Sequence, residues 1–380
     1  MTVATPATSV YVHAPFCARR CFYCDFAVKV GRVGDLPGWL EALEAELCQT
    51  ASDPLLSLAP RLDTLYVGGG TPSLLGPDAM TGLGALLGHD RLSAPGLEWT
   101  AEANPESFTA DVARAWADAG VNRVSLGTQT FHAPALRWMG RLHGPEGTLR
   151  AVEAARGAGI HNVSVDLIFG LPGHLERDWG DDLERVLALD VPHVSLYGLT
   201  VEEATPLGRR VREARERPVD EDRYGEEFLL AAEMLAGGGY EHYEVSNFAR
   251  PGRASRHNAI YWSGAPYLGL GNGAHSYAPP VRRWNLREWD DYRRVVQKGG
   301  SAEAGREVLD DEALRLERIW LGLRTARGVE LSILSPAARA LTDQWVSEGL
   351  AANEAGRLTL SRRGWLLLDR LAVDLDHASG

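Results

Sequence analysis

Short apolar runs alternate with amphipathic segments through the first two thirds of the chain. The runs have the length of buried strands and lie at 10–13, 64–67, 97–101, 123–126, 163–169 and 194–199. Residues 110–119 show the helical pattern, because apolar positions follow i, i+3, i+4, i+7 spacing from Val112. Thr109 is placed to cap this helix and Gly120 to end it. The alternation predicts six strand–helix repeats, and hence a parallel sheet with helices outside.

Two architectures fit six such repeats: an open doubly wound sheet and a barrel. Unusual residues stand at or just beyond the C-terminal ends of several strands, at 68–71, 102–105, 127–129, 166–173 and 199–203. Barrels carry active sites along that whole rim, whereas an open sheet gathers them near one switch point. We therefore predict an α/β fold with a partial (βα)6-type barrel.

The pattern changes in the last third of the chain. Residues 237–280 are rich in Gly, Tyr, Asn and His, and helical stripes then return, with a candidate hairpin strand at 358–360. Further helices are predicted at 40–47, 146–158, 179–189, 226–235, 337–346 and 364–371. We predict a core barrel over 1–235, a barrel extension over 236–300, and a small, mostly helical, winged-helix-like C-terminal domain over 301–380.

Charge and hydropathy restrict the surroundings of the protein. The formal net charge is −12, from 39 Lys and Arg against 51 Asp and Glu. A chain this acidic has no overall electrostatic footprint for nucleic acid or for an anionic membrane surface. No apolar run reaches the roughly 18 residues that a membrane span needs, and residues 1–9 do not resemble a signal peptide. These features predict a cytoplasmic protein without a transmembrane segment.

Three of the four cysteines, Cys17, Cys21 and Cys24, stand close together. In a reducing compartment such spacing indicates metal binding rather than a disulfide framework. Three thiolates can hold three irons of a [4Fe–4S] cube, and the fourth iron then keeps an open position where a ligand can react. Zinc held by the same thiolates and His13 is the alternative. Cys48 falls on a predicted helical stripe and is interpreted as a core residue.

The spacing C-x3-C-x2-C after the first predicted strand resembles the signature of the radical SAM superfamily. The stretch 68–72, GGGTP, resembles the loop that members place against the methionine end of S-adenosylmethionine (SAM), where glycines let the backbone approach a ligand. Within the superfamily the chain is most similar to the oxygen-independent coproporphyrinogen oxidases and the related HemW-type heme chaperones. The stretches that carry this likeness are 11–17, 102–106, 123–129, 166–172 and 193–197.

The resemblance implies a set of cofactors and the residues that bind them. Cys17, Cys21 and Cys24 would hold the [4Fe–4S] cluster, Glu102 the ribose hydroxyls of SAM, and Arg141 its carboxylate. The other positions implied for SAM are Tyr11, Tyr23, Gly69, Gly70, Thr71, Gln129 and Asp166. In the superfamily, one electron from the cluster splits SAM into methionine and a 5′-deoxyadenosyl radical. From position alone, the alternative role for Glu102 and Asp166 is a structural ion pair or a loop cap.

Three features separate the chaperones from the oxidases. The oxidases carry a fourth cysteine where this chain has Phe26, and they have a longer segment before the motif. The residues at 257–262, HNAIYW, resemble the H-N-x-x-Y-W motif typical of the chaperones. His257, flanked by aromatic residues, can ligate heme iron, but a fixed loop in which His257 is hydrogen-bonded and Trp262 packs fits equally well. His275 is a second candidate ligand.

The sequence therefore predicts a heme chaperone that binds a [4Fe–4S] cluster, SAM and heme. Its expected partners are an apo-hemoprotein that receives heme and a one-electron donor. An oxygen-independent coproporphyrinogen III oxidase is the alternative, and Phe26 in place of a fourth cysteine disfavours that activity. A radical enzyme that acts on another substrate is a third hypothesis.

Overall fold

Six parallel strands form the centre of the protein. The computed structural model describes residues 4–31 and 33–379. Residues 1–3 and 32 of the predicted core barrel and residue 380 of the predicted C-terminal domain lie outside this part. The six strands are β2 (Ser9–Ala14), β6 (Thr64–Gly69), β7 (Glu98–Ala103), β8 (Arg123–Gln129), β9 (Asn162–Phe169) and β10 (His193–Gly198). They follow one another in the sheet in chain order, and each contains most or all of a run predicted as a strand.

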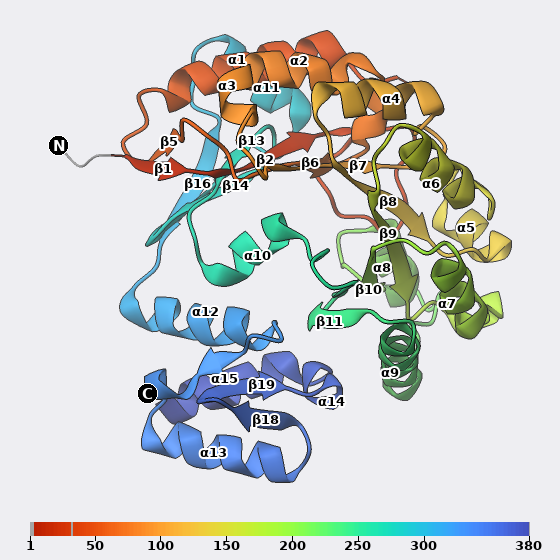
Figure 1. Cartoon of the computed structure of the whole chain (residues 1–380), viewed down its shortest axis with the longest axis vertical. Helices are drawn as coiled ribbons and strands as arrows, with labels where there is room; N and C mark the ends of the chain where they lie inside the picture. Colours follow the sequence, from red (N-terminus) through yellow and green to blue (C-terminus); the bar gives the residue numbers. More distant parts are fainter. Residues whose placement is uncertain (1–3, 32, 380) are drawn as a thin grey trace.

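Helices cover the outer face of this sheet (Figure 1). The larger ones are α1 (Leu36–Thr50), α2 (Asp78–Leu87), α4 (Ala110–Ala119), α6 (Gly147–Gly157), α7 (Trp179–Ala188) and α9 (Glu221–Gly237). Shorter helices in the connections are α3 (His89–Leu92), α5 (Ala133–Met139) and α8 (Pro206–Arg212). Helix α4 follows its sequence signals: the Thr109 hydroxyl accepts a hydrogen bond from Val112 N at 3.3 Å, and Gly120 ends the helix at a φ of 111°.

The sheet continues beyond both ends of the parallel set. Strand β13 (Leu268–Leu270) pairs in parallel with β2, while β12 (Asn247–Ala249) and β11 (Glu241–Glu244) extend the sheet antiparallel past β10. Strands β11 and β13 are its two edges within the described residues, so the curved sheet does not close. The predicted partial (βα)6-type barrel is confirmed.

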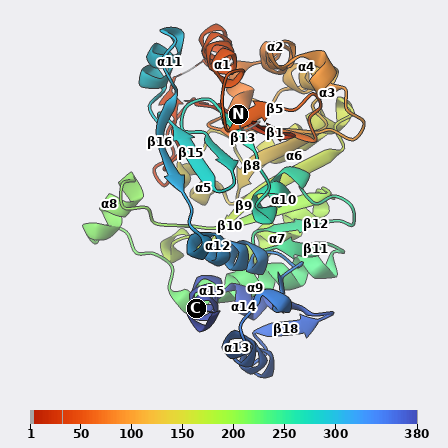
Figure 2. The same cartoon turned by 90° about the vertical axis from the view of Figure 1, so that its left-hand side faces the viewer.

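Helix α10 (Arg256–Ser263) lies on the inner side of the curved sheet, between β6 and α12 (Asp311–Leu323) (Figures 1 and 2). Glu98, at the start of β7, holds its first turn. The two carboxylate oxygens of Glu98 accept hydrogen bonds from Arg256 N at 3.1 Å and His257 N at 2.9 Å. A carboxylate is favourable there because unpaired N–H groups give a helix N-terminus partial positive charge. Helix α10 is thereby fixed at the end of the barrel where the strands begin.

The C-terminal third adds two small sheets. An antiparallel sheet consists of β14 (His275–Ala278), β15 (Val281–Asn285) and β16 (Glu303–Val308), and α11 (Trp289–Gln297) packs against α1. The elements after α12 are β17 (Val329–Glu330), α13 (Pro336–Ser347), β18 (Ala351–Glu354), β19 (Arg357–Leu360), α14 (Arg362–Trp365) and α15 (Leu368–Ser379). The predicted final helix at 364–371 is instead two helices, α14 and α15. Trp365, the last residue of α14, donates its indole N–H to the Leu323 carbonyl at 2.8 Å.

Cys48 is exposed, so its interpretation as a core residue is wrong. The buried side of α1 runs through Trp39, Ala42, Leu43, Glu46 and Thr50. An acidic residue occupies this side because the Glu46 carboxylate accepts hydrogen bonds from Gly271 N, the Asn285 amide and the Tyr292 hydroxyl, at 2.6–2.8 Å. These three donors offset the cost of burying a carboxylate.

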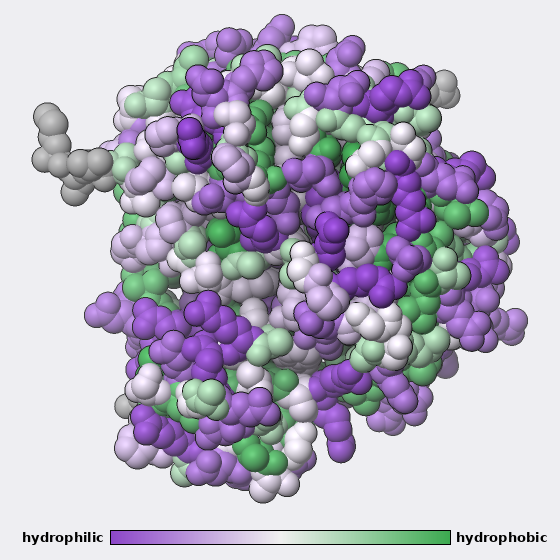
Figure 3. Space-filling model, in the orientation of Figure 1, coloured by the Kyte–Doolittle hydropathy of each residue, from purple (hydrophilic) through white to green (hydrophobic). Residues whose placement is uncertain are grey.

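The outer surface combines polar and apolar residues. Hydrophilic and hydrophobic side chains are interspersed over the face seen in Figure 3. Among the helices of residues 4–31 and 33–379, none is long and apolar enough to cross a membrane.

Candidate functional site

The three motif cysteines lie on the loop that follows β2, at the C-terminal end of the barrel. This loop starts and ends in a two-stranded clip of β3 (Phe16–Cys17) and β4 (Lys29–Val30). Within it, Cys24 N donates to the carbonyl of Cys21 at 3.1 Å, and Phe26 N donates to the Cys24 thiol at 3.5 Å. The loop therefore presents three thiols from a short, hydrogen-bonded turn.

Arg141 brings a buried positive charge beside these thiols. One of its terminal nitrogens lies 3.9 Å from the sulfur of Cys21, and the other donates to the Asn104 side chain and the Gly127 carbonyl at 2.5 Å. Its Nε is buried and has no hydrogen-bond partner within the described chain. Burial raises the pKa of Cys17 to about 11. A metal cluster that bound these cysteines would displace their protons. The free Nε–H of Arg141 beside them fits an anionic group next to such a cluster.

His13 does not complete a zinc site in this structure. Its Nε2 donates to the Ala27 carbonyl at 2.9 Å, and its Nδ1 then accepts from the Tyr11 hydroxyl at 3.0 Å. Burial lowers the pKa of His13 to about 4, so the ring is neutral and both nitrogens are occupied. In the described part of the chain, no group of three or more His, Cys, Asp or Glu side chains is arranged to hold a single metal ion. Because both nitrogens of His13 are hydrogen-bonded, the alternative Cys3His zinc site is not formed in this structure.

The glycine-rich stretch follows β6 directly. Gly69 has a φ of 105°, and a Cβ there would lie 2.3 Å from the His13 ring, so a larger residue does not fit. Gly69 N donates to one oxygen of Glu102 at 3.1 Å, and the Tyr66 hydroxyl donates to the other at 2.8 Å. Burial raises the pKa of Glu102 to about 7, although the Tyr66 hydrogen bond opposes the shift. Glu102 can therefore lose or gain a proton near neutral pH.

Asp166 and Gln129 face the same space from β9 and β8. Asp166 accepts hydrogen bonds from the hydroxyls of Ser125 at 3.0 Å and Ser164 at 3.3 Å, and burial raises its pKa. Gln129 has a left-handed φ of 69° at a bulge where the register of β8 and β9 shifts. Such backbone is unfavourable for residues other than glycine and is found disproportionately at functional sites.

The remaining residues implied for SAM lie nearby, with different surroundings. The Thr71 hydroxyl is 3.5 Å from the Cys17 sulfur. Burial raises the pKa of Tyr23, and Cys21 and Arg141 are the charged neighbours that affect it most. Tyr11 lies deeper, with its ring stacked on Tyr66 at 6.2 Å between centroids. The loop that holds the cysteines and the glycine-rich stretch are tied together, because Gly70 N donates to the Ala14 carbonyl and Thr71 N to the Phe16 carbonyl.

Two residues at this site received no role from the sequence. Asn104 links the Thr71 hydroxyl, at 3.0 Å, to the Arg141 guanidinium. Tyr66 orients Glu102. The position of Tyr66 could have been predicted from the sequence. Alternate residues of a strand share a face, so Tyr66 lies with Thr64 and Gly68 on the face of β6 that points into the barrel. Asn104 stands in one of the stretches that resemble the family, but its chemistry alone does not reveal its partners.

His257, the predicted heme ligand, lies inside the barrel and is 1% exposed. Its Nδ1 is 2.7 Å from the Thr64 hydroxyl, its Nε2 is 2.9 Å from the Tyr261 hydroxyl, and its ring stacks on Tyr66. Burial lowers its pKa to about 3, so the imidazole is neutral at physiological pH. Iron ligation by His257 would require one of these hydrogen bonds to break. The second candidate, His275, is exposed on β14.

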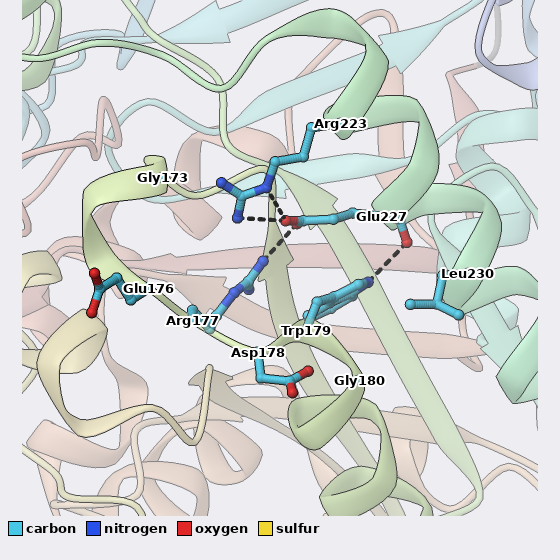
Figure 4. A pocket seen from close by; sticks show the side chains of 9 residues that line it. All are labelled: Gly173, Glu176, Arg177, Asp178, Trp179, Gly180, Arg223, Glu227 and Leu230. Carbon is cyan, nitrogen blue, oxygen red and sulfur yellow. Dashed lines mark hydrogen bonds and ion pairs between the residues drawn. The ribbon is translucent and has the colours of Figure 1, made fainter.

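A buried ion-pair network holds the loop after β9 from its outer side (Figure 4). Arg177 donates to one oxygen of Glu227 at 2.6 Å and to the Ile168 carbonyl at 2.7 Å. Arg223 pairs with the other oxygen of Glu227 at 2.8 Å. The side chain of Arg177 is fully buried, so this network is part of the interior and fixes the segment that begins with Asp166.

The chain is similar to proteins of known family. The sequence profile of the radical SAM superfamily matches residues 11–186. The heme chaperone HemW of Mycobacterium tuberculosis is 38% identical over 370 residues, covering 96% of this chain and 94% of that protein. HemW of Bacillus subtilis is 32% identical over 369 residues, covering 94% and 96%. The solved structure of coproporphyrinogen III oxidase (HemN) from Escherichia coli, a radical SAM enzyme, shares the fold, with a TM-score of 0.81 at 22% identity over 98% of this chain and 90% of that chain. The chain belongs to the HemW family of the radical SAM superfamily.

Proposed function

We propose that this protein is a cytoplasmic heme chaperone that binds heme and passes it to an apo-hemoprotein. The observation that carries the proposal is the likeness to heme chaperones of the HemW family along nearly the whole chain. Phe26, 63% exposed where the oxidases have a fourth cysteine, favours this function over porphyrinogen oxidation. The net charge of −12 disfavours nucleic acid as a partner. The partners that the proposal expects are a heme recipient and a one-electron donor.

We propose that the rim of the barrel holds the [4Fe–4S] cluster and SAM. Cys17, Cys21 and Cys24 would ligate three irons, and the fourth iron would remain open to SAM. When bound, these groups supply one-electron chemistry. Arg141 would bind the SAM carboxylate, and Glu102 would accept the ribose hydroxyls once it is ionised. The remaining contacts to SAM in this proposal come from Tyr11, Tyr23, Gly69, Gly70, Thr71, Gln129 and Asp166.

The test is an anaerobic preparation of the full chain, reconstituted with iron and sulfide and titrated with hemin. The proposal expects stoichiometric hemin binding together with four irons per chain. It also expects transfer of the bound heme to an apo-hemoprotein added afterwards. Protein that fails to bind hemin would remove the proposal. Conversion of coproporphyrinogen III to protoporphyrinogen with release of 5′-deoxyadenosine would replace it with the oxidase.

A further inference from the structure

A cavity of about 630 Å³ lies between α10, β14 and α12, away from the rim that carries the cysteines. Trp262, at the end of α10, and Tyr277, on β14, line one side, and apolar side chains of the C-terminal segment, among them Leu314, Leu321 and Ile333, line the other. The volume falls within the roughly 300–1,000 Å³ of small-molecule sites, which are mostly apolar with few polar groups. The cavity therefore has the size of a ligand site, and its lining combines apolar side chains with five charged ones.

Two polar groups at this cavity lack partners. The indole N–H of Trp262 is buried without a hydrogen-bond acceptor in the described chain. The Tyr277 side chain is 8% exposed, and its hydroxyl makes no hydrogen bond within residues 4–31 and 33–379. Buried polar groups are nearly always paired, so the buried Trp262 N–H left unpaired beside a cavity indicates a ligand or water that would pair it. The Tyr277 hydroxyl is not fully buried and adds a second free polar group to the lining.

The charges around the cavity select an anionic ligand. The lining carboxylate of Glu317 is paired with Arg282, and that of Glu330 with Arg357. Arg318 and Arg327 also line the cavity and are exposed, and neither guanidinium has an ion pair or a hydrogen bond in the described chain. Two cations of the cavity lining thus have no partner within the described chain.

We propose that this cavity binds heme, with its flat ring against Trp262 and its two propionate groups on Arg318 and Arg327. A porphyrin is large, apolar and aromatic in its centre and doubly anionic at one edge, which matches the lining and the two free cations. Tyr277 is the one lining residue of a type that ligates heme iron, so we assign its hydroxyl oxygen to the iron. This inference rests on the proposed chaperone function and gives that function a place in the fold.

The assignment also divides the H-N-x-x-Y-W motif between two environments. His257 points into the barrel, toward Thr64 and Tyr66, whereas Trp262 borders the cavity on the side of α12. The motif would then contribute its tryptophan to heme and its histidine to the inside of the barrel.

Hemin titration of the reconstituted full chain tests this site with matched variants. Trp262→Ala removes the ring, and Arg318→Glu with Arg327→Glu reverses both free cations. Arg253→Glu with Arg363→Glu is the control, because it makes the same charge change at exposed arginines outside the cavity. We expect the two cavity variants to weaken hemin binding on the order of tenfold or more and the control to match the parent protein.

Two further experiments test separately the ion pairs to the propionates and the ligation of the iron. With hemin dimethyl ester, which has no carboxylates, the Arg318→Glu and Arg327→Glu pair should lose its effect while Trp262→Ala keeps it. Tyr277→Phe should change the visible spectrum of the ferric complex. Parent-like hemin affinity in both cavity variants would overturn the site while leaving the chaperone function intact. Failure of the parent protein to bind hemin would instead overturn the function. Because the two arginines are exposed, their reversal tests the site even where Trp262→Ala lowers stability.

Discussion

Tyr66→Phe isolates one hydrogen bond at the proposed SAM site. The Tyr66 hydroxyl donates to Glu102 at 2.8 Å, and the other carboxylate oxygen accepts from Gly69 N at 3.1 Å. The substitution keeps the ring that stacks on His257 and removes only the donor. Because a donor favours the ionised carboxylate, its loss raises the pKa of Glu102 above the present value of about 7.

The size of the effect follows from the energy of that bond. A hydrogen bond to a charged group contributes about 1.5–3 kcal/mol, and 1.36 kcal/mol corresponds to about one pKa unit. The pKa of Glu102 should therefore rise to roughly 8–9 in the variant. At pH 7.5 the ionised fraction would fall from roughly three quarters to between a fifth and a fiftieth. If SAM binds the ionised form, its affinity falls roughly 4- to 40-fold at this pH.

The diagnostic is the pH dependence of that loss. Equilibrium dialysis of SAM against the anaerobic, reconstituted protein should give a ratio of parent to variant affinity that shrinks to less than about threefold at pH 9. At that pH the parent carboxyl is fully ionised and the variant carboxyl is roughly 40–90% ionised. Tyr243→Phe is the matched control, since its hydroxyl bonds His193 and Ser255 inside the barrel and does not touch Glu102. A loss of equal size at pH 7.5 and pH 9, or no loss at all, would refute the role of Glu102.

Three further predictions test other parts of the molecule. Cys21→Ser should abolish the iron content and the visible absorption of the cluster, because a hydroxyl is a poor ligand for iron, whereas Cys48→Ser on the exposed side of α1 should keep both; equal iron in the two would contradict the ligand assignment. Glu227→Ala leaves the fully buried guanidinium of Arg177 without its nearest carboxylate. Denaturant titration should therefore show a free energy of unfolding lower by about 3–5 kcal/mol. The control Glu226→Ala, at an exposed position, should lower it by less than about 0.5 kcal/mol. His257→Gln should keep stoichiometric hemin binding, because both ring nitrogens of His257 are bonded within the chain; disappearance of the hemin spectrum would return the ligand role to this histidine.

Most of the fold could be predicted because its signals are local. Helix α4 begins and ends at the predicted residues, since Thr109 and Gly120 act on backbone groups within a few positions of themselves. The interpretation of Cys48 was wrong for a non-local reason. Glu46 occupies the buried stripe of α1 with donors that lie more than 200 residues away, and no local pattern reveals them.

Within the candidate site, too, local features could be predicted from the sequence and non-local contacts could not. The cysteine spacing and the glycine-rich stretch are contiguous, so their chemistry is visible in the sequence. Arg141 reaches Cys21 across 120 positions, and only the resemblance to a family singled it out. The raised pKa of Glu102 depends on burial and on Tyr66, which are properties of the assembled barrel. Contiguous motifs thus identify the chemistry of the site from the sequence. The contacts and pKa values of its residues arise from packing and are not visible there.

The H-N-x-x-Y-W motif shows why proximity along the chain is a poor guide to a shared ligand. Positions 257 and 262 are five apart on helix α10, and at 3.6 residues per turn their side chains diverge by about 140° around the axis. In this structure the two side chains accordingly face different surroundings. Glu98 keeps it helical by holding its first turn. With the helix held in this way, His257 lies inside the barrel and Trp262 at the cavity beside α12.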